Sequence, residues 1–321
     1  MRRNPLKHLL PLTLLFCLTI SFSISPYDLA DPDSLFFEWN GIDIHYKVEG
    51  YSDKVMLLFH GFGSSTFTWE FIKDDLIADF TLIAFDRPAF GLTERVVSID
   101  KAGYNYYNFY NQSLIANELL SAIDMVPSEL ILMGHSAGTP IVIDYYLKHP
   151  TDVKGLILIS PALVHKLSEN PFAKTFSNPL IRGTVSLFRN LLARTLEGGL
   201  DESWYDVTKI TDEIRTQYKK FIQIDDWEKA LIELALNQGD YNMLKPLAEI
   251  SIPVLILFGT HDNIVPHEDV QLAVKDNPNA TVVFIDQTGH VPHEESPEKV
   301  LEQIKRWLLD IDFYNKDSRI N

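Results

Sequence analysis

The chain has 321 residues, 46% of them hydrophobic, and a formal net charge of −16 from 28 basic and 44 acidic residues. A chain of this length and apolar content can bury a full core, and one sizeable domain is the ordinary outcome. The acidic balance argues against a nucleic-acid partner, because phosphate backbones are bound by basic surfaces. It also predicts that anionic substrates are repelled at long range.

The N-terminal segment differs from the rest of the chain. Two arginines and a lysine precede residues 9–25, which carry no charge and are rich in leucine, isoleucine and phenylalanine. This pattern predicts a signal peptide or membrane anchor over residues 1–25, and therefore an exported chain, secreted, periplasmic or held at a membrane through residues 9–25. The stretch is shorter than the ~20 apolar residues of a usual spanning helix, so cleaved and anchored forms both stay open.

The segments that follow have the sequence pattern of β-strands in one sheet. Leu35–Trp39 and Ile42–Val48 flank Asn40-Gly41, a dipeptide typical of a two-residue hairpin turn. The sheet is therefore expected to begin antiparallel and to continue as parallel strands separated by helix-length segments. These further strands are predicted at residues 55–59, 81–85, 130–133, 155–160, 254–258 and 282–285.

Gly134-His135-Ser136-Ala137-Gly138 follows one of these strands and precedes a helix-like stretch at residues 141–147. A strand, a sharp turn and a helix are what is needed to expose a nucleophilic serine, here Ser136. Gly134 and Gly138 are expected where neighbouring backbone must approach closely. A serine is a weak nucleophile at its free pKa, so a histidine base and an acid that orients it are required.

The required acid and base follow in the chain. Asp262 lies on the loop that leaves the strand at 254–258, and His290 lies on the loop after the strand at 282–285. The order serine, acid, histidine is that of hydrolases of this type. Asp286 is a rival acid, but its place at a strand end makes it hard for its carboxylate to orient His290. The other histidines show no metal-ligand spacing, so no metal and no cofactor are expected.

Residues 164–249 follow a strand yet show only helix-like patterns, with apolar spacings of three and four over 179–192 and 210–236. Trp204 and Trp227 lie in this helical segment and are predicted to line a hydrophobic substrate pocket, although aromatic residues at helical spacing are more often plain core.

These segments, together with His60-Gly61-Phe62-Gly63 after the strand at 55–59, resemble the α/β-hydrolase superfamily over roughly residues 35–310. The resemblance is to the capped branch of epoxide hydrolases, haloalkane dehalogenases, esterases and carbon–carbon bond hydrolases. Residues 85–91 look like the Asp-Arg-Pro-Gly-Phe-Gly turn of that branch, with Ala89 in place of a glycine. Epoxide hydrolases and dehalogenases use an aspartate nucleophile, so the serine in this chain argues against those two activities.

The resemblance implies an α/β-hydrolase fold: a mostly parallel eight-stranded sheet flanked by helices, with a helical cap inserted after the sixth strand. It divides the chain into a core in two parts, residues 26–163 and 250–321, and a cap at residues 164–249. The loop at residues 60–63 is then where an oxyanion hole would be built, with the backbone N–H groups of Phe62 and Ala137 as donors.

Two-step acyl transfer is the predicted mechanism. His290 deprotonates Ser136, Asp262 orients His290, the Phe62 and Ala137 amides hold the oxyanion, and water then releases the acyl-enzyme. The expected substrates are esters of small or medium hydrophobic acids, because an alkoxide leaves more readily than an amide nitrogen. Hydrolysis of a carbon–carbon bond in a diketone-like compound, and a ligand receptor with little turnover, stay open as alternatives. The oligomeric state is also left open.

Overall fold

The computed structural model describes residues 23–311 and residue 313 of the chain. Most of the predicted signal or anchor segment, residues 1–22, lies outside the described residues. Among the helices of the described part, none combines the length and the apolarity that a bilayer crossing would require.

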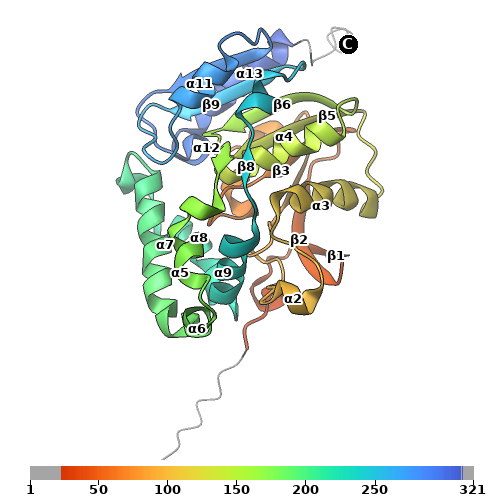
Figure 1. The fold of residues 1–321 in the computed structure, drawn as a ribbon. Coiled ribbons are helices and arrows are strands. Elements are labelled where there is room, and N and C mark those ends of the chain that lie inside the picture. Colours follow the sequence, from red (N-terminus) through yellow and green to blue (C-terminus); the bar gives the residue numbers. More distant parts are fainter. Residues whose placement is uncertain (1–22, 312, 314–321) are drawn as a thin grey trace, which may run out of the picture.

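The core is a mostly parallel sheet of eight strands (Figure 1), which confirms the predicted fold class. Strand β2 pairs antiparallel with β1 and with β4, and the remaining neighbours are parallel. In spatial order the strands are β1 (Leu35–Trp39), β2 (Ile42–Glu49), β4 (Thr81–Phe85), β3 (Lys54–Phe59), β5 (Glu129–His135), β6 (Val153–Ile159), β9 (Val254–Gly259) and β10 (Ala280–Ile285).

The hairpin between β1 and β2 forms as the sequence predicts. Asn40 and Gly41 both have positive φ, 51° and 85°, which is the conformation that a two-residue type I′ turn needs at its central positions. Trp39 then faces Ile42 directly across the pair. The turn therefore fixes the register at the antiparallel edge of the sheet.

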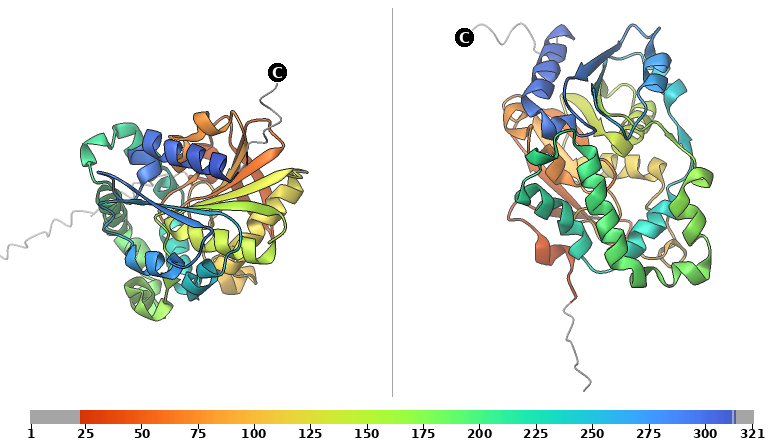
Figure 2. Two further views of the ribbon diagram at one scale, coloured as in Figure 1. Left: turned by 90° about the horizontal axis from the view of Figure 1, so that it is seen from above. Right: turned by 90° about the vertical axis from the view of Figure 1, so that its left-hand side faces the viewer.

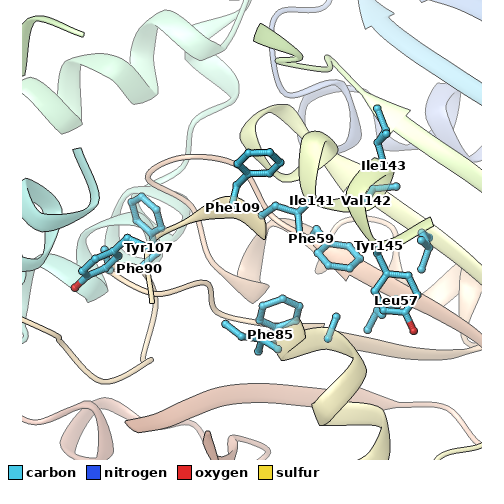
Figure 3. Packing of buried hydrophobic residues seen from close by; sticks show 14 of the residues in the cluster. Leu57, Phe59, Phe85, Phe90, Tyr107, Phe109, Ile141, Val142, Ile143 and Tyr145 are labelled. Carbon is cyan, nitrogen blue, oxygen red and sulfur yellow. The ribbon is translucent and has the colours of Figure 1, made fainter. Parts of the chain in front are cut away.

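Helices cover both faces of the sheet (Figure 2, left), because alternate residues of each strand point to opposite sides. Leu57 and Phe59 belong to the apolar cluster that includes α4, whereas Met56 and Leu58 belong to the cluster that includes α13. Figure 3 shows the first of these layers. The helices of the core are α1 (Lys73–Leu76), α2 (Ile99–Ala102), α3 (Phe109–Ala122), α4 (Thr139–Lys148), α10 (Leu244–Ala248), α11 (Glu268–Val274), α12 (Pro292–Glu295) and α13 (Pro297–Asp310).

The cap follows β6 and lies beyond the ends of the sheet strands (Figure 1). A short antiparallel pair, β7 (Val164–His165) with β8 (Tyr241–Asn242), joins its two ends, although the sequence showed only helical patterns there. Its helices are α5 (Pro171–Phe176), α6 (Pro179–Arg182), α7 (Arg189–Ser203), α8 (Asp212–Lys220) and α9 (Trp227–Asn237).

The two long helical patterns expected in the cap are each broken. The first is interrupted after α6 by the 3-10 turn Val185–Phe188, and α7 begins at Arg189. The second is interrupted between α8 and α9, where Asp226 has φ 63°. The periodic spacing of apolar residues continues across both breaks, so periodicity alone does not reveal them.

Candidate active site

Ser136 lies on the sharp turn between β5 and α4, with a positive φ of 49° and little exposure. A non-glycine residue rarely adopts this conformation, and such strain concentrates at functional sites. The two flanking glycines have the role that the sequence predicts. A Cβ on Gly134 would lie 2.7 Å from the side chain of Val142, and one on Gly138 would collide with the carbonyl oxygen of Phe59.

The structure brings Ser136, His290 and Asp262 into one hydrogen-bonded chain. His290 Nε2 lies 2.8 Å from Ser136 Oγ, and His290 Nδ1 lies 2.9 Å from Asp262 Oδ2. A carboxylate only accepts, so Nδ1 carries the proton and Nε2 presents a lone pair to the serine hydroxyl. This is the tautomer that a general base needs in order to accept a proton from serine.

Asp262 is held by its own loop after β9. Its second carboxylate oxygen accepts the N–H groups of Ile264 at 2.9 Å and Val265 at 3.1 Å. Burial by itself raises the pKa of this carboxyl, but the hydrogen bond from His290 and the two backbone N–H groups outweigh burial and lower the pKa below its usual value. The rival acid Asp286 sits at the end of β10, where its backbone carbonyl accepts a hydrogen bond from Lys299.

Two contacts hold the backbone of His290. Its N–H donates to the carbonyl of Ser203, at the end of α7, at 2.7 Å. Its own carbonyl lies 2.9 Å from His135 Nε2, which must be the donor because a carbonyl only accepts. Burial, with His293 and His290 nearby, lowers the pKa of His135 well below its ordinary value. His135 is therefore a neutral positioning group, and the cap itself helps to place His290.

Glu295 makes the second link between cap and base. Its buried carboxylate accepts the N–H of Gly289 at 2.7 Å, beside His290, and the N–H groups of Tyr205 at 3.1 Å and Asp206 at 2.7 Å, directly after α7. Sequence reasoning missed both Glu295 and Ser203. Nothing in the local pattern marks them, because their partners are backbone groups of segments far away in the chain.

His60 is buried beneath the loop that carries Phe62. Its Nδ1 donates to the carbonyl of Gly61 at 2.8 Å, and its Nε2 accepts the N–H of Arg87 at 2.9 Å. Burial and the nearby Arg87 guanidinium lower the pKa of His60 to about 3, so its ring is neutral. Both ring nitrogens are occupied, and His60 fixes the loop rather than acting as a base.

A cavity of about 320 Å³ reaches Ser136 and His290. Phe62 lines it beside Ser136 and is more than half exposed, and Ala137 follows Ser136 on the turn. That the backbone N–H groups of these two residues hold an oxyanion stays a prediction. The cap supplies most of the apolar wall, with Phe172, Leu192, Leu196, Leu231 and Leu234 among the lining residues.

Trp204 and Trp227, the two predicted pocket residues, do not line this cavity, and the prediction is corrected here. Trp204 is buried in a small apolar cluster with Ile214 and Val291 and faces a separate, more polar cavity of about 610 Å³. Trp227 is fully buried in the main core against Phe221, with ring centroids 6.2 Å apart. Both rings pack within the fold, which is the usual role of aromatic residues at helical spacing.

A second serine–histidine–aspartate contact occurs away from this cavity. His45 Nδ1 lies 2.7 Å from Asp86 Oδ2, and His45 Nε2 lies 2.9 Å from Ser34 Oγ. Asp86 also accepts the backbone N–H groups of Thr66 and Leu92, each at 2.7 Å. Burial alone would raise the pKa of Asp86, but His45 and these N–H groups hold it well below its usual range. This arrangement ties β2 to the Asp86 turn, so Asp86 has a structural role.

The described residues contain no group of three or more His, Cys, Asp and Glu side chains that could hold a metal ion. A serine, a neutral histidine and an ionised aspartate in this order can move a proton between nucleophile, base and leaving group.

Comparison with known proteins places the chain in a family. The family model described as "Alpha/beta hydrolase family" matches residues 56–303. The chain belongs to the alpha/beta hydrolase family. Among curated relatives, it is 27% identical over 282 residues to an uncharacterised hydrolase, YugF, of Bacillus subtilis (strain 168), covering 85% of this chain and 96% of that protein. It is also 26% identical over 288 residues to Lipase 1 of Psychrobacter immobilis, covering 88% and 83%.

Solved structures of alpha/beta hydrolases share the fold. The epoxide hydrolase CorEH superposes with a TM-score of 0.71 at 18% identity, covering 87% of this chain and 99% of that one. A thermophilic esterase from Thermogutta terrifontis gives 0.66 at 22% identity, covering 87% and 98%. In this alpha/beta hydrolase, Ser136, Asp262 and His290 come from loops that follow three different strands, β5, β9 and β10.

Proposed function

We propose that this hydrolase cleaves carboxylic esters of small or medium hydrophobic acids through an acyl-enzyme on Ser136. The observation that carries the proposal is the hydrogen-bonded chain from Ser136 through His290 to Asp262, at the floor of a cavity with a largely apolar wall. Relatives named as a lipase and as esterases of other organisms support the same reaction class.

The steps follow from the geometry. His290 Nε2 takes the proton of Ser136 as the serine oxygen attacks the carbonyl carbon, and the resulting imidazolium is stabilised by Asp262. The backbone N–H groups of Phe62 and Ala137 hold the developing oxyanion. His290 then gives its proton to the leaving alkoxide. Water, deprotonated by the same histidine, breaks the acyl bond and restores the hydroxyl of Ser136.

The size and the lining of the cavity support the substrate class. A volume of about 320 Å³ lies at the lower end of the range for small-molecule pockets, roughly 300–1,000 Å³. Its leucine-rich wall favours an apolar acyl group over a charged one. The charged side chains at its edge are paired: Arg215 with Asp201 at 2.7 Å and Lys219 with Glu197 at 3.2 Å.

Covalent labelling tests the nucleophile. The full chain is treated with a fluorophosphonate and its intact mass is measured, beside Ser136→Ala and His290→Ala. We expect one adduct on the parent chain and none on Ser136→Ala. Labelling of His290→Ala should be lost or slowed by several orders of magnitude, since a triad member contributes on the order of 10⁴ or more to the rate.

Ser34→Ala is the matched control, because Ser34 also contacts a histidine that contacts an aspartate. It should label like the parent chain. An adduct that persists in Ser136→Ala and disappears in Ser34→Ala would contradict the proposal. A folded parent chain that stays unlabelled would favour the ligand-receptor alternative. With labelling established, turnover of simple esters rather than diketone-like compounds separates ester hydrolysis from carbon–carbon bond hydrolysis.

A further inference from the structure

One end of the cap exposes several large apolar side chains. Leu180 and Leu187 are each 82% exposed, and their neighbours in the chain are also largely open to solvent. We call this end the cap tip; it consists of Leu180 and Ile181 of α6, Leu187 and Phe188 of the following 3-10 turn, and Leu191 in the first turn of α7. Exposed apolar residues are ordinary when scattered, but a concentration of this kind marks an interaction surface.

The cap tip is also a basic region of an acidic protein. Residues 170–196 contain Lys174, Arg182, Arg189 and Arg194 and no aspartate or glutamate, in a chain with a net charge of −16. Arg182 and Arg189 pair inward, with buried glutamates of α9. Within the described residues, the exposed Lys174 and Arg194 have no ion-pair partner. The tip therefore offers apolar side chains flanked by free positive charge.

The start of the described chain lies at the same end of the molecule. Ser23 Oγ donates to Asp225 Oδ2 at 2.6 Å, and the N–H of Asp225 donates to the carbonyl of Ile24 at 3.0 Å. The preceding residue, Ile224, accepts a hydrogen bond from Arg189 at the start of α7, at 3.5 Å. Figures 1 and 2 show the N-terminal end of the described chain leaving beside the cap. In the sequence, the uncharged apolar residues 9–22 come directly before it.

We propose that the cap tip docks on the surface of a lipid bilayer that contains anionic lipids. Leucine and phenylalanine side chains enter the boundary between headgroups and acyl chains, and neighbouring cations are attracted to anionic headgroups. An acidic protein partner would use the two free cations but would leave Leu180 and Leu187 without an apolar environment. A bilayer satisfies both, and it also takes up the apolar segment that precedes Ser23.

Docking in this orientation would bring the wall of the Ser136 cavity close to the bilayer. Leu191 points outward from α7, and the next residue, Leu192, lines the cavity, as does Leu196 one turn further on. Phe172 of α5 is both partly exposed and part of the lining. Helix α7 thus carries both a residue of the cap tip and residues of the cavity wall.

Site-specific quenching tests the docking surface in the full chain. Cys17→Ala removes the single native cysteine, and an environment-sensitive fluorophore is attached at Leu187→Cys. Val126→Cys, at a position 87% exposed in the loop before β5, is the matched control. The chains are mixed with vesicles of phosphatidylcholine and phosphatidylglycerol that carry a nitroxide quencher high in the acyl chains. We expect quenching at position 187 and none at position 126.

Three further variants, made in the Leu187→Cys chain, test the cause of the quenching. Leu180→Asp with Leu191→Asp should abolish the quenching, whereas Leu272→Asp, at another exposed leucine, should leave it unchanged. Lys174→Gln with Arg194→Gln should weaken the quenching at position 187 on anionic vesicles. The quenching should then differ little between anionic and neutral vesicles. Thermal unfolding shows that each variant is folded.

Absence of quenching at position 187, or equal quenching at position 126, would overturn the proposal. So would shielding of position 187 from aqueous iodide without vesicles, because a second copy of the chain would then cover the tip.

Discussion

Glu294 is a buried carboxyl next to the residues that position His290. One of its oxygens accepts the hydroxyl of Tyr218 at 2.5 Å and that of Thr68, while its other oxygen has no hydrogen-bond partner among the described residues. Burial raises the pKa of Glu294 to about 7, although both hydroxyl groups act in the opposite direction. At neutral pH this carboxyl is therefore close to half ionised.

Glu294 makes the stability of the fold depend on pH. The pKa is raised from 4.5 to about 7 on folding, so the folded state binds the proton more tightly, and stability falls as pH rises from about 4.5 through 7. The loss approaches roughly 3 kcal/mol above pH 7, from about 1.4 kcal/mol for each unit of pKa. Glu294→Gln cannot ionise and should lack this component. Urea unfolding of both chains at pH 5, 6, 7 and 8 measures the difference, and parallel curves would refute the assignment.

At this scale, the sequence predicts residues that carry a local signature and misses those that do not. Ser136 is marked by its glycines, and Asp262 and His290 by the strands that precede them. Ser203 holds the His290 loop through its backbone carbonyl and Glu295 through its carboxylate, and both accept backbone N–H groups of that loop. Such partners become visible only when the cap and the core are both in place.

Among the elements, α7 departs most from what its sequence favours. It runs from Arg189 to Ser203 through Gly198 and Gly199, a pair that is unfavourable in a helix interior because glycine loses much backbone entropy there. The predicted helical pattern stops at Leu192, before this pair. Tertiary contacts stabilise the helix beyond Leu192. Leu192 and Leu200 are buried, and the carbonyl of Ser203 accepts the N–H of His290. Packing therefore overrides propensity along its second half.

The glycine pair gives a prediction about stability. A Cβ added at Gly198 meets no atom within 4 Å, so Gly198→Ala should stabilise the protein by about 0.5–1 kcal/mol and raise the thermal midpoint by roughly 2 °C. The same change at Gly138, where the Cβ meets the Phe59 carbonyl, should destabilise it strongly. Thermal unfolding followed by circular dichroism compares the two. A lower midpoint for Gly198→Ala would mean that α7 needs the flexibility of its glycines.

For the whole molecule, the sheet topology explains why the site could be predicted across more than 150 residues of sequence. Parallel strands end at one edge, so the loops after β5, β9 and β10 meet there whatever the chain between them does. The cap follows no comparable rule. Where its helices break, and which of its side chains reach the cavity, depend on packing between α5, α7 and α9, and the pocket prediction for Trp204 and Trp227 was wrong for that reason.

The net charge of −16 predicts how substrates approach this site. The cations at the cavity edge, Arg215 and Lys219, are each paired with a carboxylate, so local charges cancel while the long-range field stays negative. Salt shortens the range of that field from about 30 Å at 0.01 M to about 8 Å at 0.15 M. For an ester with an anionic group, kcat/KM should therefore rise by up to about tenfold between these ionic strengths.

A neutral ester of the same acyl group is the matched control, and its kcat/KM should stay constant over the same range of salt. The comparison separates the field of the whole protein from the chemistry at Ser136, because both esters share the acyl group and the attack on its carbonyl. A fall in kcat/KM for the anionic ester would show that a local positive potential outweighs the net charge. The two unpaired cations beside the cap tip, Lys174 and Arg194, would then be the first residues to replace.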